Sequence, residues 1–157
     1  MKKNSIGSWI TLGHPSIAEI MGDSGFDWLC IDMEHSVIDY FEAQQLILAI
    51  QSKGILAFVR VGENNDRIIK RVLDAGADGI IVPMVKNKEE ALKAINSVYY
   101  PPFGKRGVGL ARAQEYGFGF DKYKKNKAKE IKLIIQIEHI DAINNLEEIL
   151  NLEGIDG

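Results

Sequence analysis

The stretch FDWLCIDMEH, residues 26–35, decides the fold because it joins an apolar run directly to a cluster of charged side chains. Residues 28–31 predict a strand buried on both faces, since such strands show near-continuous apolar sequence. Asp32, Glu34 and His35 follow at once. In parallel α/β folds this end of a strand carries the catalytic groups. The alternative is a turn whose carboxylates cap the next helix and whose histidine is merely exposed.

Composition places the chain among ordinary globular proteins. It has 157 residues, of which 46% are hydrophobic and 26% charged, and this suits a single domain over residues 1–157. The formal net charge of -3 gives no electrostatic footprint for nucleic acid or for an anionic membrane surface. We therefore expect neither of these partners.

Cysteine usage indicates a reducing compartment. Cys30 is the only cysteine and lies inside the apolar run, where a thiol behaves as a small hydrophobic group. A disulfide framework is therefore not possible, and no apolar run approaches the length that spans a bilayer. We predict a cytoplasmic protein.

Apolar periodicity and helix-capping residues predict five strands alternating with five helices. Asp39 and Glu42 have the spacing of a capping box, and Gly76 ends the helix that begins at Asn65 or Asp66. The predicted strands are residues 6–12, 28–31, 55–61, 79–85 and 131–137, and the helices begin near Pro15, Asp39, Asn65, Asn87 and Ala142.

Two segments lie outside this pattern. Residues 101–119 are too rich in glycine and proline for regular structure, and long connections of this kind are often functional, so we expect a lid. Residues 121–130 contain five lysines. A solvated helix face explains them better than an anion site does.

The alternation of strands and helices predicts a parallel sheet covered by helices, either an open doubly wound sheet or a closed eight-stranded barrel. A Gly-x-Asp junction occurs at residues 25–27 and 76–78, and again at 154–156, where the pattern calls for a sixth strand. An uncovered strand edge is a liability. We therefore expect an α/β protein of the (β/α)8 TIM-barrel type, truncated to about five strand-helix units, as the N-terminal portion of a larger barrel.

Polar residues gather at the predicted strand ends, and in a barrel they point toward one mouth. The set comprises Asp32, Glu34, His35, Arg60, Gln136 and Glu138. A carboxylate such as Glu138, without cysteine nearby, suits magnesium or manganese. Arg60 suits a planar contact with a carboxylate or enolate, and His35, oriented by Asp32, suits proton transfer near neutral pH.

Each of these residues also has a purely structural explanation. Glu138 would cap the fifth helix, Arg60 would form a buried salt bridge with Asp32, and His139 would simply lie on the surface. Taken one at a time these explanations are the better ones, but the shared position at strand ends favours a site.

Five pieces of sequence, in this order, resemble the HpcH/HpaI family of metal-dependent class II aldolases for 2-oxo acids. They are GFDWLCIDMEHS (25–36), FVRVGENND (58–66), VPMVKN (82–87), YPPFGKRGVG (100–109) and IIQIEH (134–139). The resemblance covers nearly the whole chain and implies a (β/α)8 barrel. It also implies a carbon–carbon lyase that cleaves or forms a 4-hydroxy-2-oxo acid through a metal-stabilised pyruvate enolate, with pyruvate and an aldehyde as substrates.

The resemblance also assigns catalytic roles. It implies that His35 is the catalytic base with Asp32 as its partner, and that Arg60 binds and stabilises the enolate. Gln136 then lines the same cavity.

For the metal, the resemblance implies that Glu138 is one ligand of magnesium or manganese and that Glu34 lies near metal-bound water. The family's second metal-ligating Asp follows a sixth strand, in a Gly-Pro-Ala-Asp-like segment that these 157 residues do not contain. Family members also form trimer-based hexamers through C-terminal helices, so the resemblance implies a homo-oligomer for the full-length fold and leaves it open for this chain.

Two alternatives to the aldolase follow from the same residues. One is a non-catalytic truncated barrel or a protein that binds a partner through its open edge. The other is a lyase like the citrate lyase β-subunit, which handles coenzyme A esters, although the sequence shows no coenzyme A feature.

Overall fold

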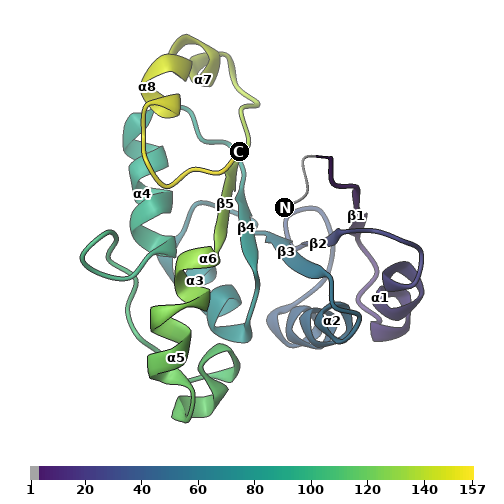
Figure 1. Cartoon of the computed structure of the whole chain (residues 1–157). Coiled ribbons are helices and arrows are strands. Elements are labelled where there is room, and N and C mark those ends of the chain that lie inside the picture. The colour runs from purple at the N-terminus through teal and green to yellow at the C-terminus, as the bar shows by residue number, and fades with distance from the viewer. Residues whose placement is uncertain (1–3) are drawn as a thin grey trace.

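Five parallel strands form one sheet in the order of the chain, β1-β2-β3-β4-β5 (Figure 1). The computed structural model describes residues 4–157. The strands are β1 (Gly7–Ile10), β2 (Trp28–Asp32), β3 (Leu56–Arg60), β4 (Gly79–Val82) and β5 (Lys132–Ile135). The helices between and after them are α1 (Pro15–Gly22), α2 (Tyr40–Ser52), α3 (Asp66–Ala75), α4 (Lys88–Val98), the 3₁₀ helix η1 (Arg112–Gly117), α5 (Phe120–Lys125), α6 (Lys127–Glu130), α7 (Ile140–Asn144) and α8 (Leu146–Leu150). This arrangement confirms the predicted α/β fold of five strand-helix units.

Side chains at the helix ends explain where the long helices begin and stop. Asp39 caps α2 and accepts from the amide of Glu42, whose carboxylate accepts in return from the amide of Asp39, so the predicted capping box is present. Asn65 caps α3, and Gly76 ends it in the left-handed conformation at φ 108°. The local sequence therefore determines where these helices begin and end.

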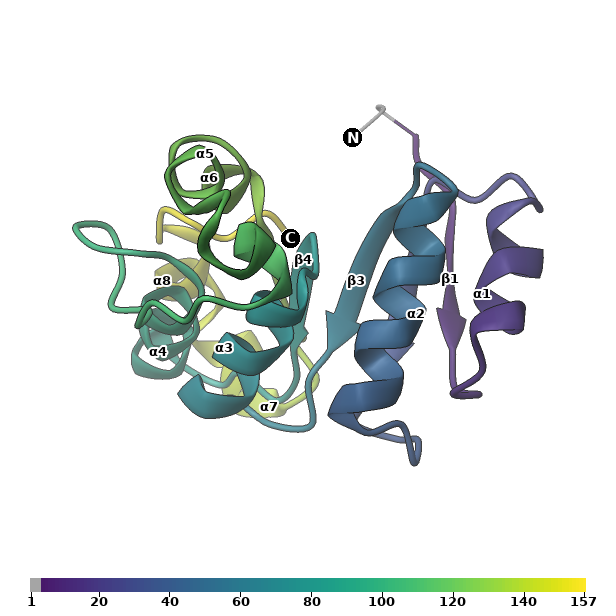
Figure 2. The same ribbon diagram turned by 90° about the horizontal axis from the view of Figure 1, so that it is seen from below.

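The strands bury side chains on both faces. Alternate residues such as Leu29 and Ile31 belong to the large core between the sheet and the helices, whereas Cys30 packs with Phe58 and Ile81 on the other, inner face. Figure 2 shows α1 and α2 beside β1 and β3 on one side of the molecule, with the later helices grouped around β4. Burial on both faces explains why these strands read as continuous apolar runs.

Glycine makes room for the aromatic rings of the inner face. A Cβ at Gly79 would lie 2.3 Å from the ring of Phe58, and one at Gly7 would lie 2.0 Å from the ring of Trp28. The Trp28 and Phe58 rings themselves contact each other with their centroids 5.6 Å apart. Larger residues at either glycine would displace this packing.

The repeated Gly-x-Asp junction has one structural role in all three copies. The backbone amide of Asp78 donates to the carbonyl of Ala57 at 2.8 Å, and the amide of Ala57 donates to the Asp78 carboxylate at 3.0 Å. The same two-bond ring joins Asp27 to Ile6, at 2.7 and 3.1 Å, and Asp156 to Leu133, at 2.8 and 3.0 Å. Asp27 and Asp78 thereby tie the starts of β2 and β4 to the start of the strand before, and Asp156 ties the last residues of the chain to the start of β5.

The last residues of the chain lie alongside β5. Besides the ring between Asp156 and Leu133, the amide of Ile135 donates to the carbonyl of Gly157 at 2.9 Å. Residues 156–157 therefore occupy the position beside β5 where the sequence pattern places a sixth strand.

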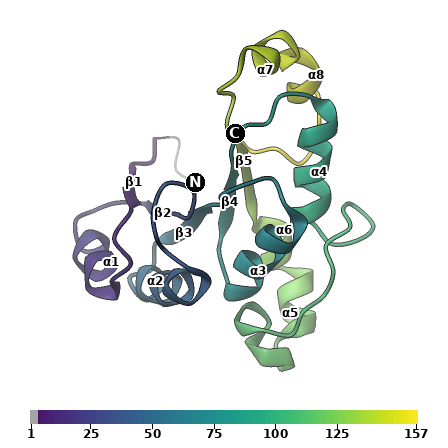
Figure 3. The same cartoon turned by 180° about the vertical axis from the view of Figure 1, so that it is seen from behind.

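The glycine- and proline-rich segment lies at the end of the sheet opposite to the one expected for a lid. Arg106 in this segment donates to Asp74 at 2.7 Å, and Arg112 donates to the carbonyl of Ala75 at 3.0 Å, near the amino end of β4. Figure 3 shows α5 at this end of β5 and α7 and α8 at the other. The lid expectation is therefore wrong, because the buried Arg106 and the half-buried Arg112 hold the segment at the amino end of the strands.

The C-terminal helical region also differs in detail from its prediction. The single helix expected from Ala142 to Asn151 is divided into α7 and α8 at Asn145, whose side-chain amide donates instead to the carbonyl of Lys86 at 3.1 Å. The five lysines of residues 121–130 are all exposed, as a solvated helix face requires. Within residues 4–157, no helix is both long enough and apolar enough to cross a membrane.

Candidate active site

The candidate site begins where the inner face of the sheet changes from apolar to charged. Asp32 follows Cys30 by two residues on β2, and Arg60 follows Phe58 by two on β3, so both side chains continue the inner face. The register pairs Asp32 with Arg60 directly. The two charged groups therefore meet at the carboxyl ends of neighbouring strands.

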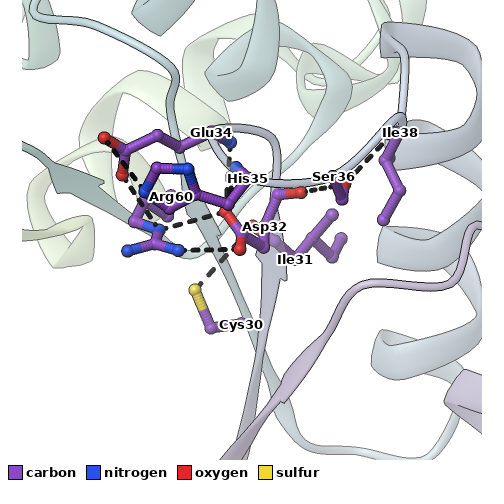
Figure 4. Close-up of polar contacts among 8 residues, drawn as sticks. All are labelled: Cys30, Ile31, Asp32, Glu34, His35, Ser36, Ile38 and Arg60. Carbon is purple, nitrogen blue, oxygen red and sulfur yellow. Dashed lines mark hydrogen bonds and ion pairs between the residues drawn. The ribbon is translucent and has the colours of Figure 1, made fainter.

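Asp32 and Arg60 form a two-point ion pair (Figure 4). Arg60 donates from Nε to Oδ1 of Asp32 at 3.0 Å and from Nη2 to Oδ2 at 2.7 Å. The Asp32 side chain is only 4% exposed and that of Arg60 15%. Burial by itself raises the pKa of Asp32, but the hydrogen bond from Arg60 and those from the amides of His35 and Glu34 outweigh it and hold the pKa below its usual range.

The turn after β2 is organised around the same carboxylate. Oδ1 of Asp32 accepts from the amides of Glu34 and His35 at 3.0 and 3.2 Å, and the carbonyl of Asp32 accepts from the hydroxyl of Ser36. The Asp32 side chain thus fixes both the guanidinium on β3 and the backbone that carries Glu34 and His35.

The Glu34 carboxylate approaches both the guanidinium and the imidazole (Figure 4). Its Oε2 is 3.3 Å from Nε of Arg60, and its Oε1 is 3.7 Å from Nε2 of His35. The expected contact between the Asp32 carboxylate and the His35 ring is not formed. Asp32 contacts the His35 backbone instead, because Arg60 and the turn amides already occupy its oxygens.

Trp9 on β1 completes the surroundings of the guanidinium. The centre of the Arg60 guanidinium lies 4.6 Å from the centroid of the indole ring, which is a cation–π contact. Within residues 4–157 no hydrogen bond is formed by Nη1 of Arg60, whereas Nε and Nη2 are both engaged. The described residues therefore leave Nη1 of a firmly held guanidinium without a hydrogen-bond partner at the carboxyl ends of the strands.

Gln136 and Glu138 lie at the same end of the sheet, beyond β5. The amide of Gln136 donates to the carbonyl of Val82, the last residue of β4, at 2.9 Å. Oε1 of Glu138 accepts from the amide of Met84 at 2.9 Å. Met84 has a left-handed backbone at φ 55°, a conformation uncommon outside glycine, which aims its N–H at the carboxylate.

The oxygen atoms near Glu138 could supply only some of the ligands of a hard divalent ion. One carboxylate oxygen of Glu138 is held by Met84, the other makes no hydrogen bond within residues 4–157, and the buried Oε1 of Gln136 is also without a hydrogen-bond partner there. The described residues hold no group of three His, Cys, Asp or Glu side chains that could bind a metal. Magnesium accepts one or two carboxylates, with water and substrate oxygens at its other positions, so a single carboxylate is compatible with such an ion.

The structure bears out one of these structural explanations and contradicts another. Arg60 does form the buried salt bridge with Asp32. Glu138 does not cap the following helix, because His139 is the N-cap of α7 and its Nδ1 accepts from the amide of Asp141 at 3.1 Å.

Two residues of the site were missed in the sequence. Trp9 could have been found, since it lies two residues after Gly7 on the inner face of the first strand. The left-handed turn at Met84 has no such signal, because its conformation depends on Glu138 from a segment 54 residues away.

Comparison with known proteins gives one consistent result. A family model described as HpcH/HpaI aldolase/citrate lyase matches residues 5–157. The 2-dehydro-3,6-dideoxy-6-sulfogluconate aldolase of Pseudomonas putida is 40% identical over 96% of the chain, and the hydroxypyruvate/pyruvate aldolase of Roseobacter denitrificans is 39% identical over 96%; each is covered over 59% of its own length. A crystal structure of an HpcH/HpaI aldolase/citrate lyase family protein from Burkholderia cenocepacia superimposes with a TM-score of 0.91 at 32% identity, covering 97% of the chain and 62% of that protein. The chain thus spans about three fifths of the length of these relatives.

Proposed function

The chain belongs to the HpcH/HpaI aldolase/citrate lyase family, and from this premise we propose that it carries part of the active site of an aldolase. The reaction we propose is the cleavage or formation of a 4-hydroxy-2-oxo acid through the enolate of pyruvate. Relatives named as hydroxypyruvate/pyruvate aldolase and pyruvate aldolase support pyruvate as the shared substrate. An aldehyde is then the second substrate.

The observation that carries this proposal is the fixed guanidinium of Arg60. Two hydrogen bonds to Asp32 and the indole of Trp9 hold it in one orientation, and Nη1 remains open at the strand ends. A planar, permanently charged group held in this way binds a carboxylate or an enolate oxygen with little loss of side-chain entropy on binding. Negative charge that develops on the enolate oxygen is stabilised most by a donor that is already in place.

His35 supplies the proton transfer in this proposal. Its side chain is 71% exposed and lies one residue beyond Glu34 in the turn that Asp32 organises. An imidazole exchanges protons readily near neutral pH, so it can remove a proton from the methyl group of pyruvate and return it.

Glu138, together with the amide oxygen of Gln136, is the group that would hold a divalent ion. A bound magnesium or manganese ion supplies Lewis acidity toward the oxygens of a 2-oxo acid. The amide of Met84, in its left-handed turn, binds one oxygen of Glu138, and the other oxygen is left to bind the metal ion.

Exchange of the pyruvate methyl protons in deuterium oxide, followed by NMR, tests the proposal without any aldehyde. We expect the 157-residue chain to catalyse exchange when magnesium or manganese is added and to lose this activity with a chelator. His35→Ala should slow exchange by about 10²- to 10⁴-fold, the usual contribution of a positioned acid or base. Arg60→Lys keeps the charge but loses the planar fork, so it should also slow exchange.

Arg67→Lys is the matched control, because Arg67 is exposed on α3 and makes no contact with the site. It should leave the exchange rate unchanged. If the wild-type chain shows no metal-dependent exchange, or if Arg60→Lys behaves like Arg67→Lys, the proposed function is wrong, and a non-catalytic chain becomes the better description.

A further inference from the structure

Two carboxylates approach the catalytic groups, and they are not equivalent. The carboxylate oxygens of Asp32 are already engaged in hydrogen bonds. They accept from Arg60 at 3.0 and 2.7 Å and from the amides of Glu34 and His35. Within residues 4–157 the Asp32 side chain forms no hydrogen bond or ion pair with the imidazole ring. The Asp32 carboxylate therefore fixes the position of the Arg60 guanidinium and of the turn backbone.

Glu34 is the carboxylate that faces the imidazole. Its side chain is 16% exposed, Oε1 lies 3.7 Å from Nε2 of His35, and Oε2 lies 3.3 Å from Nε of Arg60 (Figure 4). Oε2 is buried and forms no hydrogen bond of good geometry among the described residues. A buried carboxylate oxygen without a full set of donors is costly unless a cation stays beside it. The guanidinium of Arg60, beside Oε2, meets this need and leaves Oε1 to face the imidazole of His35.

We propose that Glu34 is the positioning residue of the catalytic histidine, holding the His35 ring through Nε2 while Arg60 holds Glu34. This inference rests on the proposed function, in which His35 moves the proton. Catalytic hydrogen bonds are often long in ligand-free structures and shorten when substrate binds, so the 3.7 Å contact is the open form of this pair.

The arrangement assigns separate tasks to the two ring nitrogens. A carboxylate at Nε2 favours the tautomer that carries its proton on Nε2, because a neutral imidazole donates from one nitrogen and accepts at the other. The lone pair is then on Nδ1, which makes no hydrogen bond within residues 4–157. Nδ1 is thus the atom that takes the proton from pyruvate and gives it back.

The chain carries its own references for a tautomer measurement. Nδ1 of His14 accepts from the amide of Ser16 at 3.2 Å, and Nδ1 of His139 accepts from the amide of Asp141 at 3.1 Å. Both rings must therefore carry their neutral-state proton on Nε2. Ring ¹⁵N chemical shifts of the ligand-free protein, recorded at about pH 8.5 where imidazoles are ordinarily neutral, compare His35 with these two rings.

We expect His35 in the wild-type chain to match His14 and His139, with the proton on Nε2. In Glu34→Ala the population protonated on Nδ1 should rise by about twofold, the size of effect that a partly exposed ion-pair contact produces. Glu34→Gln keeps an acceptor without the charge and should give an intermediate value. The control is Glu63→Gln, because Glu63 is an exposed carboxylate in the loop after the neighbouring strand β3 and should change nothing.

The same variants are then assayed for pyruvate proton exchange. Loss of ring positioning should lower the rate constant of exchange by about tenfold or more while the Michaelis constant for pyruvate changes little, because the free edge of Arg60 remains. An unchanged His35 tautomer in Glu34→Ala overturns the positioning role even if wild-type exchange is active. A shifted tautomer with no exchange in any variant keeps the positioning of the ring and rejects the proposed function instead.

Discussion

Asp32 and Arg60 lie side by side at the ends of two neighbouring strands and share two hydrogen bonds in one plane, at 3.0 and 2.7 Å. The same carboxylate also accepts from two amides of the following turn. One side chain thus couples the end of β3 to the loop after β2. The stability of the sheet and the geometry of the candidate site therefore depend on the same contact.

Asp32→Ala should lower the free energy of unfolding by about 3 kcal/mol, because it leaves the largely buried guanidinium of Arg60 with Glu34 as its one carboxylate partner among the described residues. Urea unfolding followed by circular dichroism measures the change. Asp23→Ala is the control, since it breaks the 2.7 Å ion pair with Lys53 on the surface and should have little effect on stability. Equal losses in the two variants would contradict the buried role of Asp32.

The stabilising effect of Asp32 should disappear in acid. Burial tends to raise the pKa of Asp32, but the hydrogen bonds from Arg60 and the turn amides bring it below the ordinary aspartate value. A pKa depressed by folding gives stability that is fully present above the unfolded value of about 3.9 and is lost as pH falls through the lower folded value. The difference in unfolding free energy between wild type and Asp32→Asn, measured from neutral pH downward, should therefore shrink only below about pH 4. A difference that stays constant to lower pH would rule out this linkage.

The Gly-x-Asp ring predicts a graded response at Asp78. Its carboxylate accepts from the amide of Ala57 at 3.0 Å and from the side-chain amide of Gln51 at 2.9 Å. Asp78→Ala leaves the amide of Ala57 without a partner and the side-chain amide of Gln51 with only the carbonyl of Gly76, so it should cost about 1 to 3 kcal/mol in unfolding free energy. Asp78→Asn retains one acceptor oxygen and should cost less. Thermal denaturation of both variants checks the order, and an Asn variant as unstable as the Ala variant would speak against the ring.

Metal binding should depend on substrate. With Glu138 as the carboxylate ligand among residues 4–157, we expect weak binding of magnesium or manganese that strengthens when pyruvate supplies further oxygens. Isothermal calorimetry with and without pyruvate measures this, and Glu138→Gln should remove the increase. Glu89→Gln, an exposed carboxylate on α4, is the control. Tight, Glu138-dependent binding in the absence of pyruvate would show that a ligand has been overlooked.

The strands and most helices could be predicted because their signals are local. Continuous apolar runs marked β2 and β4, while Asp39, Asn65 and Asn87 marked the starts of α2, α3 and α4. The parallel order followed from the alternation of strands and helices.

The parts that failed depend on distant contacts. Nothing in residues 101–119 indicates that Arg106 donates to Asp74 or that Arg112 donates to the carbonyl of Ala75. These hydrogen bonds determine at which end of the sheet the segment lies. The break at Asn145 likewise depends on Lys86, which is 59 residues away.

The sequence predicted where the site lies, but not which side chains contact one another there. Strand ends brought Asp32, His35, Arg60 and Glu138 to one end of the sheet, as the parallel arrangement requires. Which carboxylate faces which cation depends on side-chain geometry, and there Glu34 rather than Asp32 lies nearest the imidazole. The catalytic and metal-binding roles themselves stay predictions until the exchange and binding experiments are done.

The ring formed by each Gly-x-Asp junction has a consequence for how the protein assembles. Asp27 and Asp78 each set the alignment of a strand against its predecessor through contacts just before its first residue, and Asp156 makes the same contacts with the start of β5. A strand can therefore be added in the correct register without waiting for any strand beyond it. Folding of such a sheet becomes a stepwise extension in which each unit is coupled mainly to its neighbour, much as in repeat proteins, and the order of assembly can follow the order of synthesis from the N-terminus.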